Sequence, residues 1–186
     1  MNNTRRWMLA AGLTLAAAFG PIAQSAQAAT AADLNANGAT ALRALLAEST
    51  KAAMFNGKAR AVLVFPRIFK AGFMVGAQTG DGVLFVRGRP TAYYNISAGS
   101  FGLQAGGQAF SYVLFFMNNK ALAYLEKSDG WSIGSGPSVV VIDKSKAMSN
   151  TTTTLTQDVV AFPFGGKGLM AGLGLEGSKI TPIHPK

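Results

Sequence analysis

The sequence predicts an α+β domain that is mostly β: a strongly curved antiparallel sheet, or a small barrel-like sheet, with a few short helices packed on it. From residue 59 onward, short apolar runs alternate with turn residues, as in a series of strands. Helical periodicity is confined to two short stretches. The 22 glycines supply bends or bulges within the strands. Many bent strands that must bury apolar faces favour a curved sheet closing on itself.

The 186 residues fit one domain preceded by a targeting segment. Residues 1–28 are typical of a cleavable export signal, because Arg5 and Arg6 precede an apolar stretch and Ala26-Gln27-Ala28 resembles a cleavage site. We therefore expect an exported protein, periplasmic or peripherally membrane-associated, or secreted, with a single domain at 29–186. An uncleaved anchor is the alternative, and the paired arginines leave the Sec and twin-arginine routes open.

The domain should begin with a helical lead at residues 39–56. Leu42, Leu45 and Leu46 recur at helical spacing. Asn56-Gly57 is typical of a helix end. A second helix is expected at residues 118–127, capped by Asn118 or Asn119.

A β-rich body is predicted at residues 59–180, followed by a short tail at 181–186. Pro66 should end the first strand, and Thr79-Gly80-Asp81-Gly82 has the chemistry of a hairpin turn. The run Tyr112 to Met117 is apolar on both faces, which predicts a strand buried under a helix. The expected strands are 59–65, 71–78, 83–87, 92–98, 101–108, 111–117, one or two within 131–142, 151–156, 159–164 and 169–176.

No motif in the chain predicts an enzyme. Gly165-Gly166-Lys167-Gly168 fails the phosphate-loop pattern, and Gly134-Ser135-Gly136 has no well-placed histidine to activate its serine. The single histidine, His184, is expected to be a solvated tail residue. Asp81, Asp129 and Asp143 are read as loop residues rather than metal ligands. We expect no catalytic activity, cofactor, metal or small-molecule substrate.

The charge pattern instead indicates an anionic surface as partner. The net charge is +9 and cysteine is absent, so disulfides and thiolate sites are excluded. Four cations, Lys58, Arg60, Arg67 and Lys70, flank the apolar strand 62–65. Membranes present anionic surfaces of the kind that such residues bind.

Three segments carry a resemblance to a known family: AVLVFPRIFKAGFMVGAQTGDGVLFV, then AYYNISAGSFGLQAGGQ, then GKGLMAGLGLEGS. In this order they resemble the SYLF domain over about residues 39–180. The resemblance implies binding of phosphoinositides or other anionic lipids through basic residues and a helical amino-terminal part, and in some fungal members actin binding and bundling. The chain departs from the family pattern at 162–166, where a basic residue is missing and Lys167 is left alone.

We hypothesise that the protein binds anionic phospholipid membranes through a basic rim and an apolar wedge. The wedge would consist of Phe55, Ile68 and Phe69. The phosphate-contacting cations would be Lys51, Lys58, Arg60, Arg67, Lys70 and Lys167. The alternative for these residues is an ordinary core and a solvated rim.

Two other functions are left open by the sequence. An envelope scaffold could bind a protein partner, with actin-like binding as the family precedent, through an exposed sheet edge. A small outer-membrane β-barrel would also combine a signal with glycine-rich strands. Nucleic acid is not expected as a partner, because the export signal would keep the chain away from it and no recognisable binding module is present.

Overall fold

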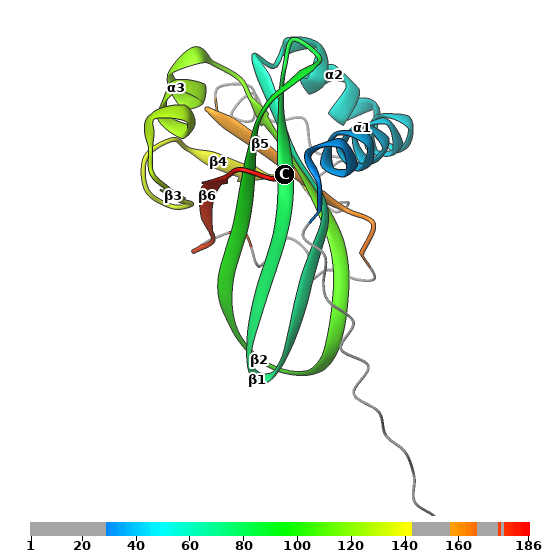
Figure 1. The fold of residues 1–186 in the computed structure, drawn as a ribbon, viewed down its shortest axis with the longest axis vertical. Coiled ribbons are helices and arrows are strands. Elements are labelled where there is room, and N and C mark those ends of the chain that lie inside the picture. Colours follow the sequence, from blue (N-terminus) through cyan, green and yellow to red (C-terminus); the bar gives the residue numbers. More distant parts are fainter. Residues whose placement is uncertain (1–28, 143–156, 167–174, 176) are drawn as a thin grey trace, which may run out of the picture.

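The computed structural model describes residues 29–142, 157–166, 175 and 177–186. Its elements are α1 (Ala31–Glu48), α2 (Thr50–Lys58), β1 (Ala61–Val86), β2 (Arg89–Phe116), α3 (Asn119–Lys127), β3 (Trp131–Ser132), β4 (Val139–Val141), β5 (Val159–Phe164) and β6 (Lys179–Ile183). The strands form one strongly curled sheet, a half-barrel with the helices packed on it (Figure 1). The predicted α+β, mostly β class is confirmed, with one parallel pair, β4 with β5, in an otherwise antiparallel sheet. The predicted signal, the strand at 151–156 and nearly all of that at 169–176 lie outside the described residues.

The amino-terminal helical region is longer than predicted and is divided in two. Thr30 and Asp33 form a capping box, in which each side chain accepts a hydrogen bond from the backbone N–H of the other. This box satisfies N–H groups that the first turn leaves unpaired, so α1 begins well before residue 39. Ser49 ends α1 and caps α2, its hydroxyl accepting a hydrogen bond from the Ala52 N–H at 3.1 Å. The single helix predicted for 39–56 is wrong in its start and continuity, and Gly57 lies within α2.

β1 and β2 form one long antiparallel hairpin in place of the six shorter strands predicted. Pro66 does not end the strand. The ladder shifts register between Phe65 and Ile68, which marks a β-bulge. There Pro66 needs no N–H partner, and its carbonyl accepts a hydrogen bond from the Ser111 hydroxyl at 2.7 Å.

The curl of the sheet brings the two halves of β1 against each other. A Cβ atom at Gly82 would lie 2.5 Å from the Phe65 ring, and one at Gly80 would lie 2.5 Å from the Arg67 carbonyl oxygen. These glycines therefore allow residues 61–71 and 76–86 to pack closely while running in opposite directions (Figure 1). The hairpin turn predicted at 79–82 is wrong, because its glycines serve close backbone approach inside a strand.

The chain reverses instead at Arg87-Gly88. Val86 pairs with Arg89, so two residues connect β1 to β2, with φ angles of 51° and 78°. Positive φ at both positions is typical of a type I′ turn, whose twist matches that of the flanking strands. The usual signal for this turn is Asn-Gly or Asp-Gly, which explains why the sequence pattern did not reveal it.

The carboxyl-terminal residues belong to the sheet. β6 pairs with residues 93–97 of β2, and the Lys186 carbonyl accepts a hydrogen bond from the Ala31 N–H at 3.0 Å. The predicted tail at 181–186 is therefore wrong for its first residues, although His184 is exposed as expected. The predictions of β5 and of the helix capped by Asn118 are confirmed.

Two hydrophobic cores lie on the two faces of the curled sheet. The inner core joins alternate residues of the long strands to Leu125 of α3 and to Trp131. The outer core takes the other residues of these strands and is covered by Leu45 of α1 and Phe55 of α2. Residues 112–116 are fully buried and contribute to both cores, as predicted for a strand covered on both faces.

Candidate functional site

The predicted cations do not form one cluster. Lys58 ends α2 and Arg60 immediately precedes β1, and both are exposed. Arg67 and Lys70 lie farther along β1, about 20 to 30 Å away at a rise of about 3.3 Å per residue. The structure therefore divides the predicted basic rim into two surfaces.

The predicted apolar wedge is wrong for two of its three residues. Phe55 and Ile68 are fully buried, so neither can enter a lipid interface. Phe55 lies on the inner side of α2, with its ring centroid 5.9 Å from that of Phe162, and the bulge at Pro66 returns Ile68 to the core face of β1. Phe69 is 51% exposed. The Arg67 guanidinium lies 4.5 Å from its ring centroid, in cation–π geometry.

The outer face of α2 presents a different apolar residue. Met54 is 40% exposed. It lies at helical spacing between Lys51, which is partly buried, and Lys58. Met54 was not among the predicted site residues. It lies nine residues after the buried Leu45, about 180° around a helix of 3.6 residues per turn, so its exposure agrees with helical spacing. Lys167 lies outside the described residues.

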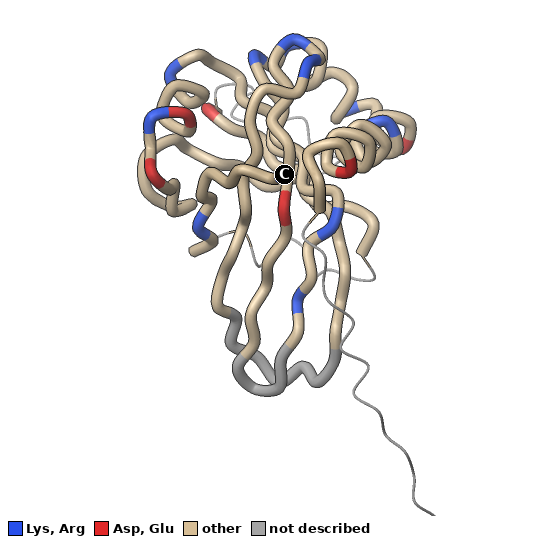
Figure 2. The backbone as a smooth tube through the Cα atoms, viewed as in Figure 1, with Lys and Arg blue, Asp and Glu red and all other residues tan. Residues whose placement is uncertain are grey.

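Four exposed cations gather at one end of the molecule, where α2, the start of β1 and the β1–β2 turn meet (Figure 2). We name this group the basic end; it consists of Lys58, Arg60, Arg87 and Arg89. The opposed halves of β1 explain the gathering, because the contacts at Gly80 and Gly82 place the start of β1 beside its end. Arg87 and Arg89 were not among the predicted site residues, since no sequence signal related the turn to the end of α2.

The positive charge of the basic end is not compensated within the described part of the chain. None of its four side chains makes an ion pair, side-chain hydrogen bond or ring contact there. The described acidic residues lie elsewhere along the backbone, on α1, around α3 and within the sheet (Figure 2). Exposed arginine and lysine groups in this state can bind phosphate oxygens of a ligand surface.

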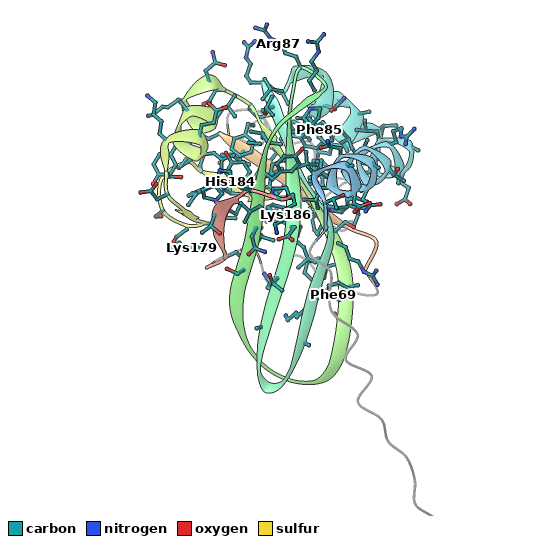
Figure 3. The ribbon with its side chains drawn as sticks, in the orientation of Figure 1. Phe69, Phe85, Arg87, Lys179, His184 and Lys186 are labelled. Atoms are coloured by element: carbon teal, nitrogen blue, oxygen red, sulfur yellow. The ribbon has the colours of Figure 1, made fainter. Side chains whose placement is uncertain are left out.

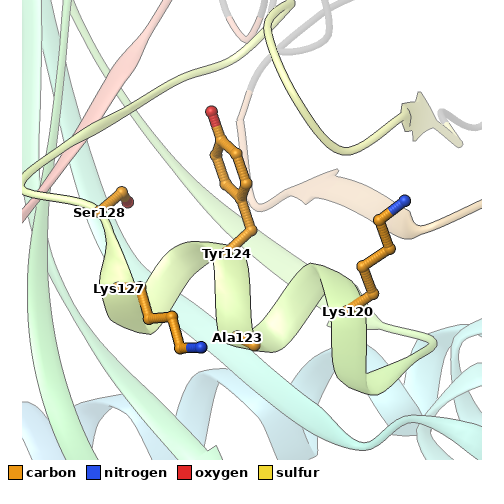
Figure 4. Close-up of a pocket in the computed structure, with 5 residues that line it drawn as sticks. All are labelled: Lys120, Ala123, Tyr124, Lys127 and Ser128. Carbon is orange, nitrogen blue, oxygen red and sulfur yellow. The ribbon is translucent and has the colours of Figure 1, made fainter.

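A further basic surface lies on α3. Lys120, Ala123, Tyr124, Lys127 and Ser128 line an open hollow of about 360 Å³ (Figure 4). Tyr124 is 42% exposed, and all the lining belongs to α3 or the residue that follows it. The hollow thus offers two ammonium groups and one aromatic ring.

Asp158 joins the start of α3 to the sheet. Its carboxylate accepts hydrogen bonds from the Asn118 side chain at 2.8 Å and from the Ser138 backbone N–H at 2.9 Å. The bond from the Ser138 backbone, followed by that from Asn118, lowers the pKa of Asp158 below its ordinary value. The group is structural, because each bond ends on a neighbouring element of the fold.

Other site types find little support in the residues described. Among them, no three His, Cys, Asp or Glu side chains lie close enough to hold a metal ion. No helix in the same residues has the length and hydrophobicity required to cross a bilayer.

A comparison with protein families gives a match to Ysc84, the SYLF domain, described as Las17-binding protein actin regulator, over residues 97–184. The matched part begins within β2 and extends through β6. It does not include the basic end. A comparison with curated proteins gives no match.

Proposed function

We propose that this protein binds anionic phospholipid membranes through the basic end. Residues 97–184 match the SYLF family, as the resemblance predicted. One observation carries the proposal: four exposed cations, with no ion-pair partner among the described residues, gather where the curled sheet brings the start of β1 to the β1–β2 turn. The negative leaflet surface is the complementary partner. Binding of this kind requires no catalytic group, and we propose that the protein is not an enzyme.

The expected affinity is modest. Each Lys or Arg near an anionic leaflet contributes about 1 kcal/mol, so the basic end would contribute about 4 kcal/mol. This corresponds to a dissociation constant of about 1 mM. Insertion of Met54, of which 40% is already exposed, would add about 1 kcal/mol. Binding should be reversible and sensitive to salt.

The shape of the molecule sets the orientation on the membrane. The basic end lies at one end of the long axis, and the labelled side chain of Phe69 lies well away from it on the sheet (Figure 3). We propose that the protein docks end-on, with Met54 and the cations toward the lipid. Arg67, Phe69 and Lys70 would then remain off the surface.

The cell envelope is the proposed location, on the basis of the export signal expected at 1–28. The positive charge of the domain would suit an anionic phospholipid surface there. The second class of partner that we propose is a protein of the envelope. The matched family is described as a Las17-binding protein actin regulator, which supports a protein partner.

Sedimentation with vesicles tests the proposal. The full chain is mixed with vesicles of phosphatidylcholine alone, or of phosphatidylcholine with phosphatidylglycerol, at ionic strengths of about 0.1 M and about 1 M. We expect binding only to the anionic vesicles, with most of it lost at the higher ionic strength. Equal binding to both vesicle types, or binding that salt leaves unchanged, would overturn the proposal.

A further inference from the structure

Arg87 occupies a backbone conformation that arginine rarely adopts. It is the first of the two residues that connect β1 to β2, and its φ of 51° lies in the left-handed region. Among the described residues, Arg87 is the single non-glycine residue with positive φ. Steric conflict between Cβ and the backbone makes this region costly for most L-residues.

The type I′ turn has a well-known preferred residue at this position. Asparagine or aspartate tolerates the left-handed conformation, and glycine follows it, as Gly88 does here. An arginine offers no local hydrogen bond of the Asn or Asp kind to offset the conformational cost. For folding alone, Asn-Gly would be the better sequence for this turn.

No contact within the described structure explains the arginine. The Arg87 side chain is exposed and has no ion pair, side-chain hydrogen bond or ring contact there. Figure 3 shows it at the extreme end of the molecule, beyond the strands that it connects. Local strain that the fold does not require is a reason to look for a functional contact.

We infer that Arg87 is a direct phosphate-contacting residue, present at the hairpin tip for ligand binding and at a cost to the turn. The inference rests on the proposed function and names one residue of the basic end that contacts phosphate. The ligand group is the phosphate of a phospholipid at a bilayer surface, since a planar guanidinium can donate two parallel hydrogen bonds to phosphate oxygens. The two-residue turn holds Arg87 at the end of the molecule, and Arg89 lies at the start of the next strand.

Substitution of Arg87 should have opposite effects on stability and on binding. In R87N the turn gains its preferred residue, and the melting temperature should rise by about 2 to 4 °C. Loss of one leaflet-facing cation should weaken binding to phosphatidylglycerol-containing vesicles about fivefold. R87K keeps both the charge and the strained backbone, so it should melt like the wild type and bind more tightly than R87N.

The control is K179N, which removes one exposed positive charge from β6, away from the basic end (Figure 3). It should bind vesicles like the wild type, whereas R87N should not. If R87N binds as tightly as the wild type, or if K179N weakens binding as much as R87N does, the inference is wrong while the proposed function stands. If R87N melts no higher than the wild type, the turn carries no strain and the inference is also wrong. A wild-type protein that does not bind anionic vesicles would instead refute the proposed function itself.

Discussion

End-on docking predicts that two pairs of cations, equal in charge, differ in their effect on membrane binding. One double variant, K58Q/R60Q, removes two charges from the basic end. The matched variant, R67Q/K70Q, removes two charges from the flank of β1. Both carry the same net charge, so a difference between them reports position alone.

The size of the difference follows from the geometry. Lys58 and Arg60 lie where α2 meets β1, beside the turn, and two leaflet-facing cations contribute about 2 kcal/mol. Their loss should weaken vesicle binding about thirtyfold. Arg67 and Lys70 lie about 20 to 30 Å farther along β1, beyond the Debye length of about 10 Å at 0.1 M salt. Their loss should change binding by less than about twofold.

The assay is vesicle sedimentation at fixed lipid composition and ionic strength, with circular dichroism spectra to verify that both variants are folded. Equal losses of binding in the two variants would show that net charge, rather than the basic end, determines the affinity. A larger loss in R67Q/K70Q would refute end-on docking and favour contact along the sheet.

Three further predictions concern the packing of α1, the Asp158 carboxylate and the apolar contact. G38A should lower the free energy of unfolding by about 1 kcal/mol, because its new methyl group would collide with Val83 and overpacking outweighs the gain in helix propensity; a thermal melt that shows stabilisation would contradict this. D158N should cost about 1 kcal/mol at pH 7. Since the folded pKa of Asp158 lies below its ordinary value of 3.8, its stabilisation is present above that value and is lost as the pH falls through the folded pKa. Melting curves of the wild type and D158N should therefore converge in strong acid, and a constant difference would exclude the carboxylate as the cause. M54A should weaken anionic-vesicle binding about two- to fivefold without lowering the melting temperature, and unchanged sedimentation would place the apolar contact elsewhere.

Much of the local structure could be predicted because neighbouring residues determine it. Asn118 caps α3 through its own side chain, and the fully apolar run at 112–117 has to be covered on both faces. The errors arise where distant contacts override local signals. Pro66 is accommodated by a bulge, and Gly80 and Gly82 resemble a turn in sequence but lie inside a strand.

The candidate site shows the same division. Amino-acid composition alone established that the chain is strongly basic and has no cysteine, and residue order established its mostly β character and its SYLF resemblance. The grouping of the charges required the curled sheet, because residues 58–60 and 87–89 become neighbours only when the two halves of β1 pack together. The burial of Phe55 likewise depends on a distant contact, because its ring packs against Phe162 of β5. Charge and propensity are properties of each residue, whereas proximity and exposure arise from contacts between segments far apart in the chain.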